Sequence, residues 1–162
     1  EGGEWKLALD IWNSELPLPG ATASSPLEGA WIVTSWTDAD GKTIDEPQPA
    51  MYVFTPTHYS IMIALGTEPR ATYEGEDMTD AETLVAYDTL VANSGRYEID
   101  GNVLKTRAYV AKDTNYMGGW PDNEVTYEFE HDGDTLTIKN LGGPNIGATG
   151  TFRQVEGTPN PW

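Results

Sequence analysis

The sequence predicts an all-β protein, an eight-stranded antiparallel barrel with one inserted helix at about residues 78–92. Segments that alternate apolar and polar residues recur along the chain, and Asp-Gly pairs at 40–41, 100–101 and 132–133 join several of them. Asp-Gly favours a type I′ hairpin turn, in which both central residues have positive φ. An antiparallel sheet of this size usually closes into a barrel or pairs into a sandwich. A barrel of about eight strands can hold one small ligand.

The first half of the barrel is predicted from three strand segments. Residues 30–36 (AWIVTSW) lead into the first Asp-Gly turn. Residues 51–55 (MYVFT) and 59–63 (YSIMI) flank a tight connection at 56–58, which predicts a hairpin.

One segment between the strands is predicted to be helical. Residues 77–82 (DMTDAE) contain N-cap candidates and early acidic residues, which suit a helix N-terminus. Apolar residues follow at roughly helical spacing, and residues 93–95 (NSG) are expected to end the helix.

Strand patterns resume after the helix. Residues 124–130 (EVTYEFE) alternate most cleanly, with Val, Tyr and Phe on one face and Glu and Thr on the other. The remaining predicted strands are residues 96–99, 103–111, 135–138 and 149–156, with loops at 112–123 and 142–147.

The chain divides into three parts. Residues 1–26 form an N-terminal extension with a Pro/Ser-rich linker, 27–156 the barrel, and 157–162 a C-terminal tail. Residues 4–12 (EWKLALDIW) are apolar, and we expect them to dock on their own domain or on the sheet of a second copy. The second alternative predicts self-association.

Composition excludes several partners. The net charge is −17, from 26 acidic and 9 basic residues, so nucleic acid and anionic membrane surfaces are unfavourable partners. No apolar stretch is long enough to span a membrane. Cysteine is absent, which removes disulfides and thiolate metal sites. The chain starts at Glu1, either because a signal peptide was removed or because the sequence was trimmed. The acidic balance and the Pro/Ser-rich lead-in favour an exported protein, secreted or periplasmic.

The predicted barrel interior is the first candidate site. In each of two adjacent strands, alternation predicts that one face points into the barrel. Trp31 and Phe54 are expected to face inward as well, or to close one end of the barrel. The two inward faces consist of Val125, Tyr127 and Phe129, and of Leu104, Thr106, Ala108 and Val110. An interior rich in Trp and Tyr suits an apolar ligand, whereas the alternative is a core filled by its own side chains.

Polar candidates complete the predicted ligand-binding set. Tyr52, Tyr97 and Tyr127 are expected hydrogen-bond donors, with sheet packing as the alternative. Arg107 and Arg153 would hold an oxyanion if they point inward, and otherwise pair with surface acids.

The remaining candidates are weaker. His58, near the barrel end, is either an acid-base group at the pocket mouth or an exposed turn residue, and Met62 follows on the next strand segment. His131 precedes a turn and is expected in solvent, so no metal site and no cofactor are predicted. Residues 38–46 faintly resemble a calcium loop, but a hairpin turn explains them better.

Several segments in order resemble the bacterial lipocalin-like domain family over residues 27–156. They are residues 27–31 (LEGAW), 38–42 (DADGK), 52–56 (YVFTP), 93–101 (NSGRYEIDG) and 150–155 (GTFRQV). The resemblance implies a calycin-type barrel with a cavity for a small apolar molecule. The chain departs from the family pattern at Thr57-His58, where Asp-Gly is common, and at residues 105–108 (KTRA), where a histidine pair is common.

Three functions are therefore expected in order of preference. The first is binding of a small hydrophobic molecule in the lumen. The second is an enzyme acting on a small apolar substrate as a cyclase, isomerase or hydrolase, in which orientation and a polar lumen residue would contribute. The third is an assembly subunit that docks through residues 4–12.

Overall fold

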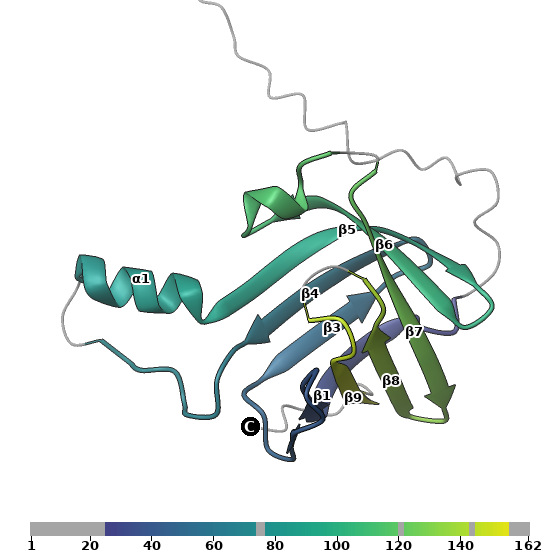
Figure 1. Cartoon of the computed structure of the whole chain (residues 1–162), viewed down its shortest axis with the longest axis horizontal. Coiled ribbons are helices and arrows are strands. Elements are labelled where there is room, and N and C mark those ends of the chain that lie inside the picture. The colour runs from purple at the N-terminus through teal and green to yellow at the C-terminus, as the bar shows by residue number, and fades with distance from the viewer. Residues whose placement is uncertain (1–24, 74–76, 120–121, 143–144, 156–162) are drawn as a thin grey trace, which may run out of the picture.

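A closed antiparallel barrel forms the body of the molecule (Figure 1). The computed structural model describes residues 25–73, 77–119, 122–142 and 145–155. Nine strands are paired in the order β2-β1-β3-β4-β5-β6-β7-β8-β9, and a β1–β9 pairing closes eight of them into a ring that omits β2. Among the described residues, the expected all-β architecture, an eight-stranded antiparallel barrel with one α-helix, is confirmed. Residues 1–24, which hold the apolar segment 4–12, and the tail 157–162 lie outside the described residues.

The elements follow the predicted order along the chain. The ring consists of β1 (Gly29–Thr37), β3 (Ala50–Phe54), β4 (His58–Ala64), β5 (Leu90–Asp100), β6 (Val103–Ala111), β7 (Glu124–Asp132), β8 (Thr135–Asn140) and β9 (Thr149–Gln154). The two-residue strand β2 (Thr43–Ile44) pairs with the last residues of β1, beyond the part that pairs with β3. Helix α1 (Asp80–Asp88) follows β4, and the 3-10 turn η2 (Thr114–Tyr116) follows β6.

The three Asp-Gly pairs lie at hairpins, but the expected type I′ geometry is wrong. Asp100 pairs with Val103, and Asp132 pairs with Thr135, so each aspartate is the last strand residue and the glycine is the first residue of the turn. Gly101 and Gly133 have φ of +62°, and the residue after each does not have positive φ. One positive φ at the first central position is the requirement of a type II′ turn.

Helix α1 is shorter than predicted and projects from the barrel at the start of β5 (Figure 1). Thr79 caps it through a capping box with Glu82, as the acidic start of the segment indicated. The helix ends at Asp88 rather than near residue 92, and residues 93–95 belong to β5, where they pair with β4. Their Asn-Ser-Gly sequence marks a bulge in β5–β6 pairing, not a helix end.

Two irregularities in pairing change which side chains face inward. Between β5 and β6, Gly95 pairs with Ala108 and Ser94 pairs with Val110, which leaves an extra residue in β6. The prediction that Val110 points inward is therefore wrong: it is 58% exposed, and Ala111 faces the lumen instead. A similar shift in β1 lies between Val33 and Ser35.

One end of the barrel is solidly packed. Trp31 is fully buried there, and its indole N–H donates to the Leu27 carbonyl at 2.8 Å. The Tyr97 hydroxyl donates to the Thr55 carbonyl at 2.6 Å. The fully buried set also contains Phe152 and Leu136. Large apolar side chains whose donors find acceptors thus close this end, which we call the closed end.

Candidate functional site

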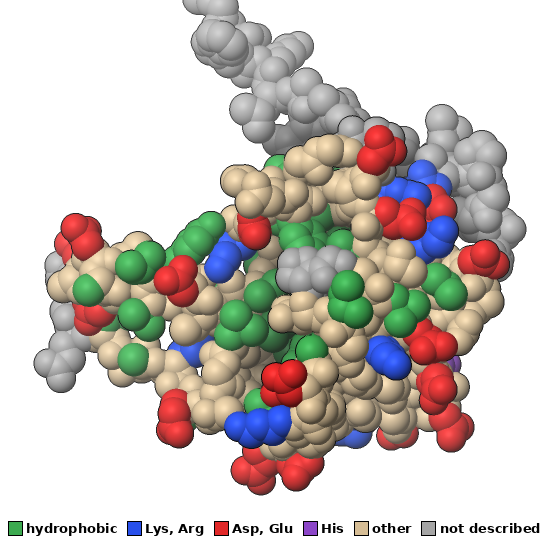
Figure 2. Space-filling view, viewed as in Figure 1, with side chains coloured by type: hydrophobic (Ala, Val, Ile, Leu, Met, Phe, Trp, Pro, Cys, Tyr) green, Lys and Arg blue, Asp and Glu red, His purple; other side chains and the backbone are tan. Residues whose placement is uncertain are grey.

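The other end of the barrel contains a half-open cavity of about 790 Å³. Figure 2 shows a hollow in this face with hydrophobic side chains inside it. The lining comes from strands β1 to β8, from α1 and η2, and from the loops between them. Its apolar members are Val33, Trp36, Ala39, Ile44, Pro47, Ala50, Ile61, Ile63, Ala64, Leu65, Val91, Ala92, Ala111, Ile138 and Ala148. We call this half of the barrel the open end.

Small side chains explain why the open end is hollow. Inward positions on β3, on β6 and before β9 carry Ala50, Ala111 and Ala148. The closed end has Trp31 and Phe152 on neighbouring strands. Since a barrel of this size is just wide enough for large side chains to fill, alanines on several walls leave space.

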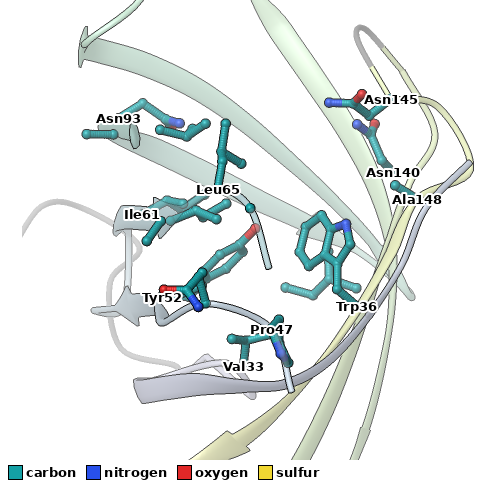
Figure 3. A pocket seen from close by; sticks show the side chains of 18 of the residues that line it. Val33, Trp36, Pro47, Tyr52, Ile61, Leu65, Asn93, Asn140, Asn145 and Ala148 are labelled. Atoms are coloured by element: carbon teal, nitrogen blue, oxygen red, sulfur yellow. The ribbon is translucent and has the colours of Figure 1, made fainter. Parts of the chain in front are cut away.

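Two aromatic side chains reach into the cavity from neighbouring strands. Figure 3 shows the Tyr52 phenol extending from β3 and the Trp36 indole from β1. The bulge in β1 gives Trp36 its inward direction, because it follows the register shift after Val33. Asn93 lies on one side of the cavity, and Asn140 and Asn145 lie on the other. The cavity therefore combines apolar walls with a few polar groups, which is the usual composition of a small-molecule site.

Four phenols gather inside the barrel. Burial raises the pKa of Tyr52, and the neighbouring phenols of Tyr116 and Tyr59 raise it further. Burial also raises the pKa of Tyr59 to about 12, against a lowering effect of the Thr106 hydroxyl. The pKa of Tyr127 rises through burial first, then through the neighbouring phenols of Tyr116, Tyr52 and Tyr59 and a hydrogen bond with Tyr116. Tyr52, Tyr59 and Tyr127 therefore stay protonated at neutral pH.

Charged groups of the lining lie in loops at the mouth. Asp38 follows β1, and Lys112 and Asp113 follow β6. The Lys112 ammonium donates to the Tyr87 carbonyl at 2.5 Å and lies 4.1 Å from the centroid of the Tyr87 ring. The Tyr87 hydroxyl donates to the Lys112 carbonyl at 2.9 Å, so this pair ties α1 to the end of β6.

The predicted ligand-binding residues fall into three places. Tyr52 and Tyr127 line the cavity. Trp31, Phe54, Tyr97 and Phe129 belong to the buried core cluster, and Thr106 is buried in β6. The residues on the outer surface are His58, Met62, Arg107 and Arg153. The structure therefore brings two of the predicted residues to the cavity, and a role in binding stays a prediction for all of them.

The outer residues have partners or solvent around them. Arg107 forms ion pairs with Glu98, at 3.2 Å, and with Glu124. His58 lies beside Tyr109, with ring centroids 5.9 Å apart, and Met62 is 55% exposed. No group of three or more potential metal ligands occurs among the described residues. Nor does the described part of the chain contain a helix long and apolar enough to cross a membrane.

Sequence reasoning missed several residues of the cavity. Tyr116 belongs to η2, in a segment that gave no alternation to interpret. Trp36 is predicted to lie in a strand, but its inward direction is not predicted. The bulge that turns it inward leaves no clear sign in the sequence of β1. The alanines on the walls gave no usable signal, because Ala111 follows the register shift in β6 and Ala148 lies outside a strand.

Comparison with known proteins gives distant structural neighbours. No protein-family model and no curated protein matches the chain. A lipocalin-like protein from Bacteroides uniformis is 21% identical, with a TM-score of 0.47 over 81% of this chain and 100% of that chain. An uncharacterized protein from Bacteroides eggerthii is 14% identical, with a TM-score of 0.44 over 80% of this chain and 99% of that one.

Proposed function

We propose that this protein binds a small, mostly apolar molecule in the open end of the barrel. The observation that carries the proposal is the half-open cavity of about 790 Å³, with walls formed mostly by aliphatic and aromatic side chains. Ligand sites of proteins are typically clefts of about 300–1,000 Å³ with such walls and few polar groups. Export of the protein, an enzymatic role and self-association through residues 4–12 stay predictions.

The proposal can be tested with fluorene, a rigid and uncharged hydrocarbon, in equilibrium dialysis against the full chain. We expect saturable binding at one site per chain. Ala111→Phe places a ring in the cavity and should weaken binding at least about threefold, because side-chain volume replaces ligand volume.

Val110→Phe is the matched control. Val110 precedes Ala111 in β6 but is 58% exposed on the outer surface, so its substitution should leave fluorene binding unchanged. Absence of saturable binding, or equal effects of the two substitutions, would contradict the proposal.

A further inference from the structure

We propose that the cavity selects uncharged ligands that carry a hydrogen-bond-accepting oxygen, such as a ketone, quinone or ester, and that the Tyr52 hydroxyl donates to this oxygen. This inference rests on the proposed function, because it specifies the chemistry of a ligand in the same cavity. It goes further by predicting which of several ligands of equal size and shape is preferred.

The first step is that donors at the open end lack acceptors. Within the described part of the chain, neither the Tyr52 hydroxyl nor the Trp36 indole N–H makes a hydrogen bond, and both groups face the cavity. The Tyr59 hydroxyl is not part of the cavity lining, but it is also buried, with 3% of the residue exposed, and has no partner among the described residues. Buried polar groups without partners are rare in proteins and call for an explanation.

The closed end shows that this lack of acceptors is local. There the Trp31 indole donates to a carbonyl at 2.8 Å, and the Tyr97 hydroxyl donates to another at 2.6 Å. The same two residue types, tryptophan and tyrosine, are therefore satisfied at one end and unsatisfied at the other. A bound acceptor atom would account for the difference.

The carboxylates at the mouth of the cavity already accept backbone hydrogen bonds. An Asp38 carboxylate oxygen accepts the backbone N–H groups of Asp40 and Lys42, at 3.0 and 2.9 Å. The Asp113 carboxylate accepts the Asn115 N–H at 2.9 Å. Because burial raises the pKa of Tyr52 and Tyr127, both phenols keep their protons at neutral pH and can donate hydrogen bonds.

The charges argue for an uncharged ligand. Lys112 is the lining cation, and it lies at the mouth with its ammonium bound to Tyr87. Arg107 and Arg153 lie on the outer surface. A carboxylate in the cavity would lose its hydration without a cationic partner, inside a protein of net charge −17. A carbonyl oxygen accepts the same hydrogen bonds without that penalty.

The experiment compares four probes that share one tricyclic body. Fluorenone carries a carbonyl, fluorene carries no oxygen, 9-fluorenol carries a hydroxyl, and fluorene-9-carboxylate carries a charge. We expect fluorenone to bind about fivefold more tightly than fluorene, with 9-fluorenol between them. The carboxylate should bind at least about tenfold more weakly than fluorenone.

A substitution assigns the preference to the Tyr52 phenol. In Tyr52→Phe, fluorenone should bind no more tightly than fluorene, and fluorene should stay within about twofold of its original affinity. Retained fluorene binding also shows that the variant is folded. Tyr73→Phe, on an exposed tyrosine outside the cavity lining, is the matched control and should leave the affinities of all four probes unchanged.

The outcomes separate the two proposals. Equal affinities of fluorene and fluorenone, tighter binding of the carboxylate, or a carbonyl preference that survives in Tyr52→Phe would each overturn this inference while leaving the proposed function intact. If none of the four probes binds, both are overturned.

Discussion

The two ends of the barrel are built from the same strands but are filled differently. At the closed end, large side chains such as Trp31 and Phe152 are fully buried, and the donors there reach backbone carbonyls. At the open end, alanines line several walls, and the Tyr52 phenol and the Trp36 indole point into free space. The bulges in β1 and β6 lie between these two levels.

This difference in packing predicts different roles for the two ends of the barrel. Packed apolar side chains with satisfied donors supply most of the free energy of folding. A cavity with unsatisfied donors lowers the stability of the fold for two reasons. The side chains that line it have no packing contacts on the side that faces the cavity, and its polar groups have no hydrogen-bond partners. The closed end should therefore control unfolding and the open end should control binding.

The largest expected effect is at Trp31. Trp31→Ala should lower the free energy of unfolding by about 3–5 kcal/mol, because it leaves a cavity in the closed end and removes the hydrogen bond to the Leu27 carbonyl. Trp36→Ala, which removes the same side chain at the open end, should cost less than half as much. Urea denaturation followed by circular dichroism measures both, and equal losses would contradict the division between the ends.

Alkaline pH should destabilise the protein through its buried phenols. Their pKa is raised in the folded state, so between pH 10 and the folded pKa they are ionised only in the unfolded chain, and stability falls as pH rises. For Tyr59 this window runs from 10 to about 12, with a loss of ~1.4 kcal/mol per pH unit.

Urea titrations at several pH values would measure that loss. Tyr59→Phe should make the decline less steep between pH 10 and 12. A phenolate absorbance at 295 nm whose whole titration in the folded protein has its midpoint near pH 10 would show that the phenols are accessible and would refute the prediction.

At neutral pH, the same substitution should increase stability. Tyr59→Phe removes a buried hydroxyl that has no partner among the described residues, so the free energy of unfolding should rise by about 1 kcal/mol. Tyr97→Phe is the comparison at the closed end, and it should lower stability because it removes a hydrogen bond to the Thr55 carbonyl. A loss of stability in Tyr59→Phe would mean that the hydroxyl is satisfied in solution.

The sequence predicted the closed end better than the open end, for a physical reason. Alternation of apolar and polar residues predicts which side chains face inward as long as the pairing of the strands is regular. This prediction is correct for Leu104, Thr106 and Ala108, which are buried. It failed at Val110, immediately after the extra residue in β6. A bulge is set by how two strands fit together, and one strand's pattern carries little sign of it.

A cavity is harder still to predict, because it depends on residues that are distant in sequence. Ala50, Ala111 and Ala148 face the same space only after the barrel has closed. Tyr116 enters it from an irregular loop, where no periodicity applies. The sequence could therefore predict an interior with aromatic residues, but not which part of it is empty.

The smallest expected effect on stability concerns α1, which stands at the open end and contains no buried residue. Figure 2 shows hydrophobic side chains exposed along it, in agreement with the exposure of Leu84 and Val85. Thr79→Ala removes the capping hydroxyl of this helix and should speed amide hydrogen exchange in its first turns. The free energy of global unfolding should change by less than about 0.5 kcal/mol, because a helix without buried contacts can unfold locally while the barrel stays closed.

Thr106→Ala, at a buried threonine within the barrel, is the control and should reduce global stability more. A large global loss in Thr79→Ala would show instead that the open end and its helix fold together with the closed end.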